Sequence, residues 1–222
     1  MHLQLYFSWE WFCAALALAI ITAVIMARLG RHFFTHDVVD RRFSILDLEF
    51  AATTLEIVHV IKGIYKLPQT QSSSTLKALR AQLLVDFLFM PAIYGAIFFG
   101  CMHVSTKMTT FWGRDAFAVL AWLQFIPWLC DIIENIYLLQ KIKPDVVPST
   151  DGLHKAYQWM ELIKWGVSLT GAVCSIAALL FFWVSGKFVA ASFPYLIIVI
   201  AEVILFFILS KLFVPKPVMN LN

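Results

Sequence analysis

The sequence predicts an all-α membrane protein, a bundle of five transmembrane helices with one amphipathic helix on the cytoplasmic side. Of its 222 residues, 61% are hydrophobic and 14% are charged, whereas soluble domains average about 45–50% apolar and about 25% charged residues. The mean hydropathy is +0.80, and several apolar runs are long enough to cross the roughly 30 Å of bilayer hydrocarbon. We therefore expect one membrane domain over residues 1–222.

Five runs are long and apolar enough to be transmembrane helices: residues 8–29, 79–104, 115–140, 158–185 and 189–213. The first run is too long and too aromatic at its start to be a cleaved signal peptide. Pro91 and Pro127 lie inside the second and third runs, where each removes a backbone donor and predicts a kink. In the fourth run, a polar stripe at helical spacing predicts close interhelical packing. The stripe consists of Tyr157, Glu161, Lys164, Ser168, Gly171 and Ser175.

Residues 43–65 show helical periodicity but carry too many charged side chains for an ordinary span. The distribution of basic residues decides their placement, because Lys and Arg are enriched on the cytoplasmic side of membrane proteins. If this segment does not cross, 13 Lys and Arg residues lie inside and three lie outside, and a sixth span would break that asymmetry. We therefore predict an amphipathic helix at the cytoplasmic face, with the N-terminus outside and the C-terminus in the cytoplasm.

The run at 115–140 carries three polar side chains toward one end: Asp131, Glu134 and Asn135. Residues three and four apart share a helix face, so these side chains project together, with Gln124 earlier on the same line. A carboxylate in the middle of a membrane costs roughly 2.5–3.5 kcal/mol, so such groups need a partner, a proton or a cation. This face is the leading candidate for a functional site.

Further ionisable side chains lie at a matching depth in other spans, about 9–15 Å from the nearest cytoplasmic basic residue at about 1.5 Å per residue. We predict one water-accessible cavity that faces the cytoplasm, since charges dispersed toward lipid would be too costly. The predicted ligand-binding residues are Asp86, Asp131, Glu134, Asn135, Glu161, Lys164, Glu202 and, from the surface helix, Glu49. Within this set, Asp86, Asp131 and Glu134 are the candidate metal ligands.

Structural explanations compete with these functional ones. The three polar residues of the central run could instead pair with Lys164 and join helices through hydrogen bonds. Glu161 and Lys164 also fit an ion pair at a helix interface. Glu56 and His59 fit a solvated helix face better than a metal site, because no second ligand pair accompanies them. We interpret His154 as an ordinary residue of an inner loop.

Three short segments carry a resemblance to known proteins: ILDLEFA at 45–51, LLVDFLFMPAIYG at 83–95 and CDIIENIYLL at 130–139, with a Lys-Trp pair at 164–165. In this order they resemble a group of small, uncharacterised bacterial integral membrane proteins with LDxEFA, DFxF and DxxEN segments. The resemblance covers most of residues 45–165 and brings no assigned activity. It implies a shared polar set that consists of Glu49, Asp86, Asp131, Glu134 and Asn135.

Three classes of function fit these residues. Five carboxyls against one ammonium favour a protein that binds a cation, a proton or a cationic or amphiphilic small molecule, such as a transporter. Carboxylate and amide oxygens suit divalent cations, so a divalent cation is the candidate cofactor. A membrane-embedded enzyme could instead apply metal-assisted or carboxyl acid–base chemistry to a lipid or isoprenoid substrate, with no catalytic residue assigned. The third class is a structural or accessory membrane subunit.

The expected partners are the lipid bilayer and a small-molecule or lipid ligand. Basic residues cluster at the ends of apolar runs and do not interleave with aromatic ones, which excludes a nucleic-acid surface. We expect a multi-pass protein of the cell inner (plasma) membrane.

The predicted topology places the polar linker after residues 43–65 in the cytoplasm. A Ser73→Cys variant that lacks the four native cysteines should react with a membrane-impermeant maleimide only after spheroplasts are opened. Labelling of intact spheroplasts at this position would show that residues 43–65 cross the membrane.

Overall fold

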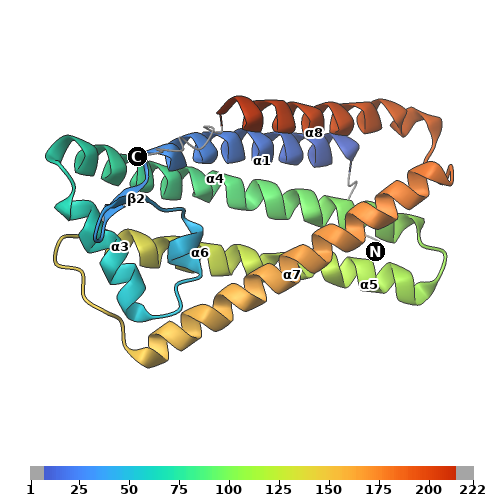
Figure 1. The fold of residues 1–222 in the computed structure, drawn as a ribbon. Coiled ribbons are helices and arrows are strands. Elements are labelled where there is room, and N and C mark those ends of the chain that lie inside the picture. Colours follow the sequence, from blue (N-terminus) through green and yellow to red (C-terminus); the bar gives the residue numbers. More distant parts are fainter. Residues whose placement is uncertain (1–7, 214–222) are drawn as a thin grey trace. The chain divides into compact units, whose positions relative to one another are not determined.

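The computed structural model describes residues 8–213 and is almost entirely helical, which confirms the predicted all-α class. Figure 1 shows the elements along the chain. In order they are α1 Trp9–Leu29, η1 Gly30–His32, β1 Phe34–His36, β2 Asp40–Arg42, α2 Leu46–Glu49, α3 Thr54–Lys66, α4 Gln69–Lys107, α5 Phe111–Leu123, α6 Phe125–Lys141, α7 Asp151–Val184, η2 Ala190–Ser192 and α8 Phe193–Phe213.

Five helical segments among the described residues are long and apolar enough to cross a membrane. They are Trp9–His32, Gln69–Lys107, Phe111–Lys141, Asp151–Val184 and Ala190–Lys211. In each, only 6–28% of the most apolar window is buried inside the protein, which leaves most of its side chains for contact with lipid. Each segment overlaps one predicted span, so the prediction of five helices long and apolar enough to cross a membrane is confirmed.

The chain forms two compact units, each assembled from three stretches of sequence. Of the described residues, unit 1 contains 8–21, 88–129 and 163–206, and unit 2 contains 22–87, 130–162 and 207–213. Each unit has a hydrophobic core of its own.

The core of unit 2 is built around α3. The buried residues on this helix are Ile57, Val58, Val60, Ile61, Gly63 and Ile64, and its charged side chains are exposed. The same core includes Leu79 of α4 and Leu138 of α6. Helix α3 is therefore amphipathic, as its periodicity predicts, and other parts of unit 2 cover its apolar face.

Residues 43–65 do not form one continuous helix, because side chains cap two separate helix starts. The backbone N–H of Ser44 donates to Asp47 Oδ2 at 2.7 Å before α2. The N–H of Ala52 donates to Glu56 Oε2 at 2.7 Å before α3. Each bond satisfies a backbone donor that has no partner inside the helix. Residues 50–53 consequently form a turn, called the α2–α3 turn below.

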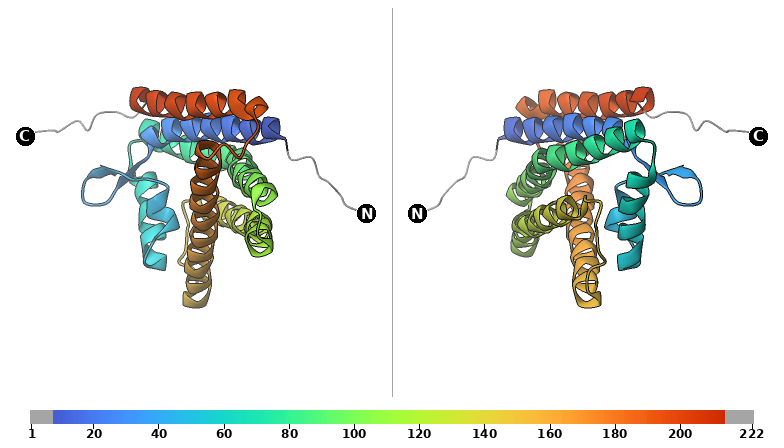
Figure 2. Two further views of the ribbon diagram at one scale, coloured as in Figure 1. Left: turned by 90° about the vertical axis from the view of Figure 1, so that its right-hand side faces the viewer. Right: turned by 90° about the vertical axis from the view of Figure 1, so that its left-hand side faces the viewer.

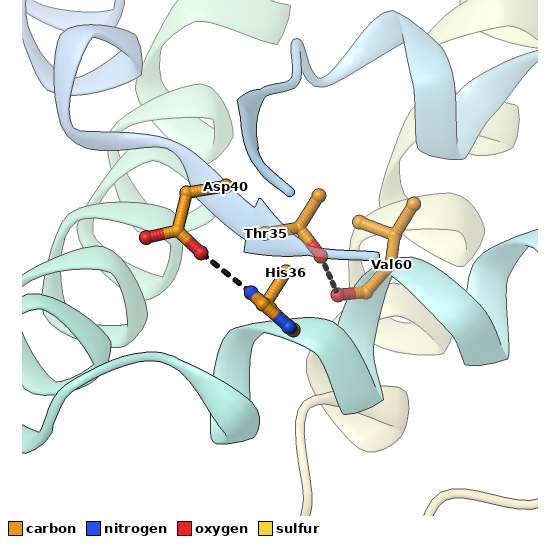
Figure 3. Close-up of polar contacts among 4 residues, drawn as sticks. All are labelled: Thr35, His36, Asp40 and Val60. Carbon is orange, nitrogen blue, oxygen red and sulfur yellow. Dashed lines mark hydrogen bonds and ion pairs between the residues drawn. The ribbon is translucent and has the colours of Figure 1, made fainter. Parts of the chain in front are cut away.

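A β-hairpin that the sequence patterns did not predict lies beside α3 in both views of Figure 2. Its strands are antiparallel, with His36 opposite Asp40, and His36 Nδ1 lies 2.6 Å from Asp40 Oδ1. Thr35 Oγ1 donates to the carbonyl oxygen of Val60 at 2.9 Å (Figure 3). Gly63 permits this close packing, because a Cβ there would overlap Thr35 Oγ1 and lie 2.6 Å from the carbonyl oxygen of His36.

The core of unit 1 is rich in aromatic side chains. The Trp9 ring stacks on His103 with a centroid separation of 4.0 Å and on Trp183 with a separation of 4.9 Å. Phe12, Leu179 and other apolar side chains form the buried cluster of this unit.

The third span, predicted as one run, is one helical stretch whose hydrogen bonding is interrupted at a single residue, Gln124, between α5 and α6. Figure 1 shows these two helices in succession. Pro127 has no N–H to donate to the carbonyl of Leu123, and its ring crowds that carbonyl. Gln124 is 2% exposed, and its Nε2 donates to the carbonyl oxygens of Leu120 at 3.1 Å and Val167 at 3.5 Å. A side-chain amide thus replaces part of the backbone hydrogen bonding at the break.

The close packing of the hairpin against Gly63 predicts that a larger residue there destabilises the protein. Gly63→Ala should push the hairpin away from α3 and lower the free energy of unfolding by about 1–3 kcal/mol, the usual effect of overpacking. Thermal unfolding in detergent measures this change. Gly152→Ala is the matched control, because nothing lies within 4 Å of a Cβ at Gly152. Equal melting temperatures for the two variants would contradict the close packing of the hairpin.

Candidate functional site

The polar face of α6 is buried. The side chains of Asp131, Glu134 and Asn135 are 9%, 2% and 2% exposed, whereas those of Ile133 and Ile136 are 58% and 46% exposed. Helical periodicity therefore separates a polar inner face from an apolar outer face that is free to contact lipid.

Asn135 joins this face to α4. Its Nδ2 donates to Asp86 Oδ2 at 2.8 Å and to the carbonyl oxygen of Leu83 at 3.2 Å. A hydrogen bond to a carboxylate is stronger than one between neutral groups. The pair of bonds therefore fixes the Asn135 amide and holds Asp86 beside it.

Helix α7 brings a second row of polar side chains into unit 2. His154, Tyr157 and Glu161 are 6%, 5% and 2% exposed, and their spacing places them on one helix face. On the opposite side, Trp159 and Leu162 are 65% and 62% exposed. The helix begins at Asp151, earlier than the predicted start at 158, so His154 is a helical residue and not a loop residue.

Two side chains of α7 hold the α2–α3 turn. His154 Nε2 lies 3.2 Å from the carbonyl oxygen of Ala52. Gln158 Nε2 lies 3.4 Å from the carbonyl oxygen of Ala51 and 3.2 Å from that of Ala52. Carbonyl oxygens only accept, so both side chains donate. Because Glu49 directly precedes this turn, these bonds fix its position relative to α7.

Three carboxylates meet at this point, one each from α2, α6 and α7. Glu49, Glu134 and Glu161, called the carboxylate cluster below, each contribute an oxygen, and these oxygens all lie within 4.8 Å of one another. Glu134 and Glu161 are each 2% exposed, and Glu49 is half-buried. These residues are 27 or more positions apart in the sequence, so only the tertiary fold brings them together.

The three carboxylates of the cluster repel one another when they are ionised. Two ionised carboxylates at such a distance repel by roughly 3–4 kcal/mol at an effective dielectric constant of about 20. Burial adds a further cost for each charge. Three negative charges therefore need compensation by a proton, a bound cation or neighbouring positive groups.

The Tyr157 hydroxyl is a further polar group next to the cluster. It precedes Glu161 by one helical turn, and the charges of Glu134, Glu161 and Glu49 act on it. Among the described residues, Tyr157 Oη has no hydrogen-bond partner. A buried hydroxyl normally finds a partner, so this oxygen is available to a ligand or water held by the carboxylates.

The other predicted site residues are distributed differently. Asp131 is buried on α6 one turn before Glu134, outside the group of three carboxylates. Lys164 and Glu202 belong to unit 1, where Lys164 is buried and Glu202 is half-buried. The metal set of Asp86, Asp131 and Glu134 stays a prediction, and only Glu134 is common to that set and the cluster.

The sequence reasoning did not identify His154 and Gln158 as positioning residues. Their spacing from Tyr157 and Glu161 could have identified them, because these four positions share one helix face when α7 is extended toward its N-terminus. Glu56 and His59 are both exposed, and Glu56 accepts the N–H of Ala52 as a cap, in keeping with a solvated helix face.

Comparison of the chain with protein families, with curated proteins and with solved structures gave no match. The resemblance of its three short segments to a group of bacterial membrane proteins therefore stays a prediction, and the geometry of the site carries the case for function.

Proposed function

We propose that this integral membrane protein binds a hard divalent cation at the carboxylate cluster and that binding is a step in transport of the cation. The observation that carries the proposal is the convergence of Glu49, Glu134 and Glu161, whose oxygens lie within 4.8 Å of one another. Two of the three side chains are 2% exposed. A bound cation would offset the repulsion between the carboxylates, because each of them would be attracted to its positive charge.

The spacing suits a cation of the size of Ca²⁺. Oxygens on opposite sides of one Ca²⁺ lie about 4.6–5.2 Å apart, and those around Mg²⁺ about 4.0–4.2 Å apart. The oxygens of the cluster, within 4.8 Å of one another, can therefore contact Ca²⁺ with little movement. Small rotations of the side chains would accommodate a smaller ion.

The donor set selects the same class of ion. The three ligands are carboxylates, which suit Mg²⁺, Ca²⁺ and Mn²⁺, whereas thiolates and imidazoles select softer metals. The Tyr157 hydroxyl adds a neutral oxygen beside them. Ordered water completes the coordination of such ions in most proteins.

The break at Gln124 favours transport over a purely structural role. Pro127 leaves the carbonyl of Leu123 without its usual helical donor, and main-chain groups freed inside a span occur at the ion sites of transporters. In unit 1, Gln124 Oε1 is buried and has no hydrogen-bond partner among the described residues. A polar group of this kind inside a span is expected where water or an ion passes.

The charge distribution suggests the side on which the site opens. Among the described residues, 12 of the 16 Lys and Arg side chains belong to unit 2. Because basic residues concentrate on the cytoplasmic side, we infer that the cluster opens toward the cytoplasm.

Cation-dependent stability tests the proposal. Wild-type protein in detergent should be stabilised by about 2.7 kcal/mol at a Ca²⁺ or Mn²⁺ concentration 100 times the dissociation constant. Glu134→Gln should remove most of this stabilisation. Without divalent cation, the variant should be as stable as the wild type or more so, because one source of repulsion is lost. Thermal unfolding with and without each cation measures both effects.

Asp145→Asn is the matched control, because Asp145 is an exposed carboxylate of the same unit, and it should respond to cations as the wild type does. A wild type indifferent to divalent cations, together with a Glu134→Gln variant destabilised under all conditions, would indicate a structural charge network and contradict the proposal.

A further inference from the structure

A second polar site lies in unit 2, in a groove between the end of α3 and the first turns of α4. The groove has a volume of about 470 Å³. Its lining consists of Tyr65, Leu67, Gln69, Ser72, Ser73, Leu76, Lys77 and Arg80. Most of these residues lie on one face of α4, because they recur at intervals of three and four.

The charged residues that line the groove are Lys77 and Arg80, and both are basic. Residues 57–85 contain no Asp or Glu, and their charged residues are Lys62, Lys66, Lys77 and Arg80. Arg80 Nη2 donates to the carbonyl oxygen of Ile142 at 3.3 Å, which holds the guanidinium in place. The end of α6 and the segment after it add Lys141 and Lys143, with a single acid, Asp145.

The donors in the groove match a phosphate group. Arg80 and Lys77 lie one turn apart on α4, and a guanidinium can donate two parallel hydrogen bonds to phosphate oxygens. The hydroxyls of Ser72 and Ser73 and the amide of Gln69 add neutral donors. Because the start of α4 borders the groove, free backbone N–H groups of its first turn add to the positive potential.

The position along α4 places the groove at the membrane surface. The helix has 39 residues and is about 58 Å long at 1.5 Å per residue, whereas the hydrocarbon of a bilayer is about 30 Å thick. Residues 69–75 are all polar, and the residues from 83 to 102 are apolar apart from Asp86. The groove residues therefore lie where lipid phosphates lie, and Tyr65 is a residue type enriched at that level.

We propose that the α3–α4 groove binds the phosphate group of an anionic lipid headgroup through Lys77 and Arg80. Free phosphate offers the same chemistry from solution, so a test has to separate the two sources. This site does not depend on the carboxylate cluster, and either can fail without the other.

The test uses the full chain in detergent, titrated with phosphatidylglycerol and followed by native mass spectrometry. Each Lys or Arg near an anionic surface contributes about fivefold to binding, so Lys77→Gln/Arg80→Gln should bind the lipid about 25-fold more weakly. Lys62→Gln/Lys66→Gln is the matched control, because it removes the same charge from the same unit outside the groove lining. This control should lose less than about threefold, as expected for charges without direct contact.

Circular dichroism should show that both double variants remain folded, since all four side chains are exposed. If inorganic phosphate displaces the lipid, the groove recognises the phosphate group alone. If the lipid stays bound in the presence of phosphate, the groove also requires the rest of the lipid headgroup. Wild-type protein that binds neither ligand, or equal losses in the two double variants, would overturn the proposal.

Discussion

The mutual repulsion of three clustered carboxylates is the constraint on which the arrangement of unit 2 depends. Glu134 and Glu161 lie on helices long and apolar enough to cross a membrane, where an ionised carboxyl is costly. Glu49 comes from a short helix outside those spans and adds a third like charge. Such an arrangement persists only where the fold holds it and the charges are compensated.

A series of contacts that begins at the β-hairpin holds the carboxylate cluster in place. The hairpin packs on α3 at Gly63 and Val60, and α3 packs in the core of unit 2. The α2–α3 turn is then fixed to α7 by His154 and Gln158. Contacts that extend from the hairpin through α3 to α7 therefore position the segment that carries Glu49.

The sequence predicts the spans and the polar face of α6 well, because hydropathy and helical spacing are local properties. It does not predict the hairpin, whose strands are three residues long and lack a long alternating pattern. The sequence also does not predict which carboxylates lie beside Glu134. Matching depth places Glu161 in one layer with Glu134, and Glu49 is added from the surface helix, but the predicted metal set is Asp86, Asp131 and Glu134, whereas the structure groups Glu134 with Glu49 and Glu161. Depth fixes one coordinate, and the rotation of each helix about its axis depends on tertiary packing.

Anomalous scattering from crystals of the protein grown with Mn²⁺ tests the central claim most directly, since it locates the ion without mutation. Binding at the cluster predicts one anomalous peak at coordination distance from carboxylate oxygens of Glu49, Glu134 and Glu161. A structure with these three carboxylates close together, no peak between them and a lysine ammonium in that position would contradict cation binding and establish a structural ion-pair network.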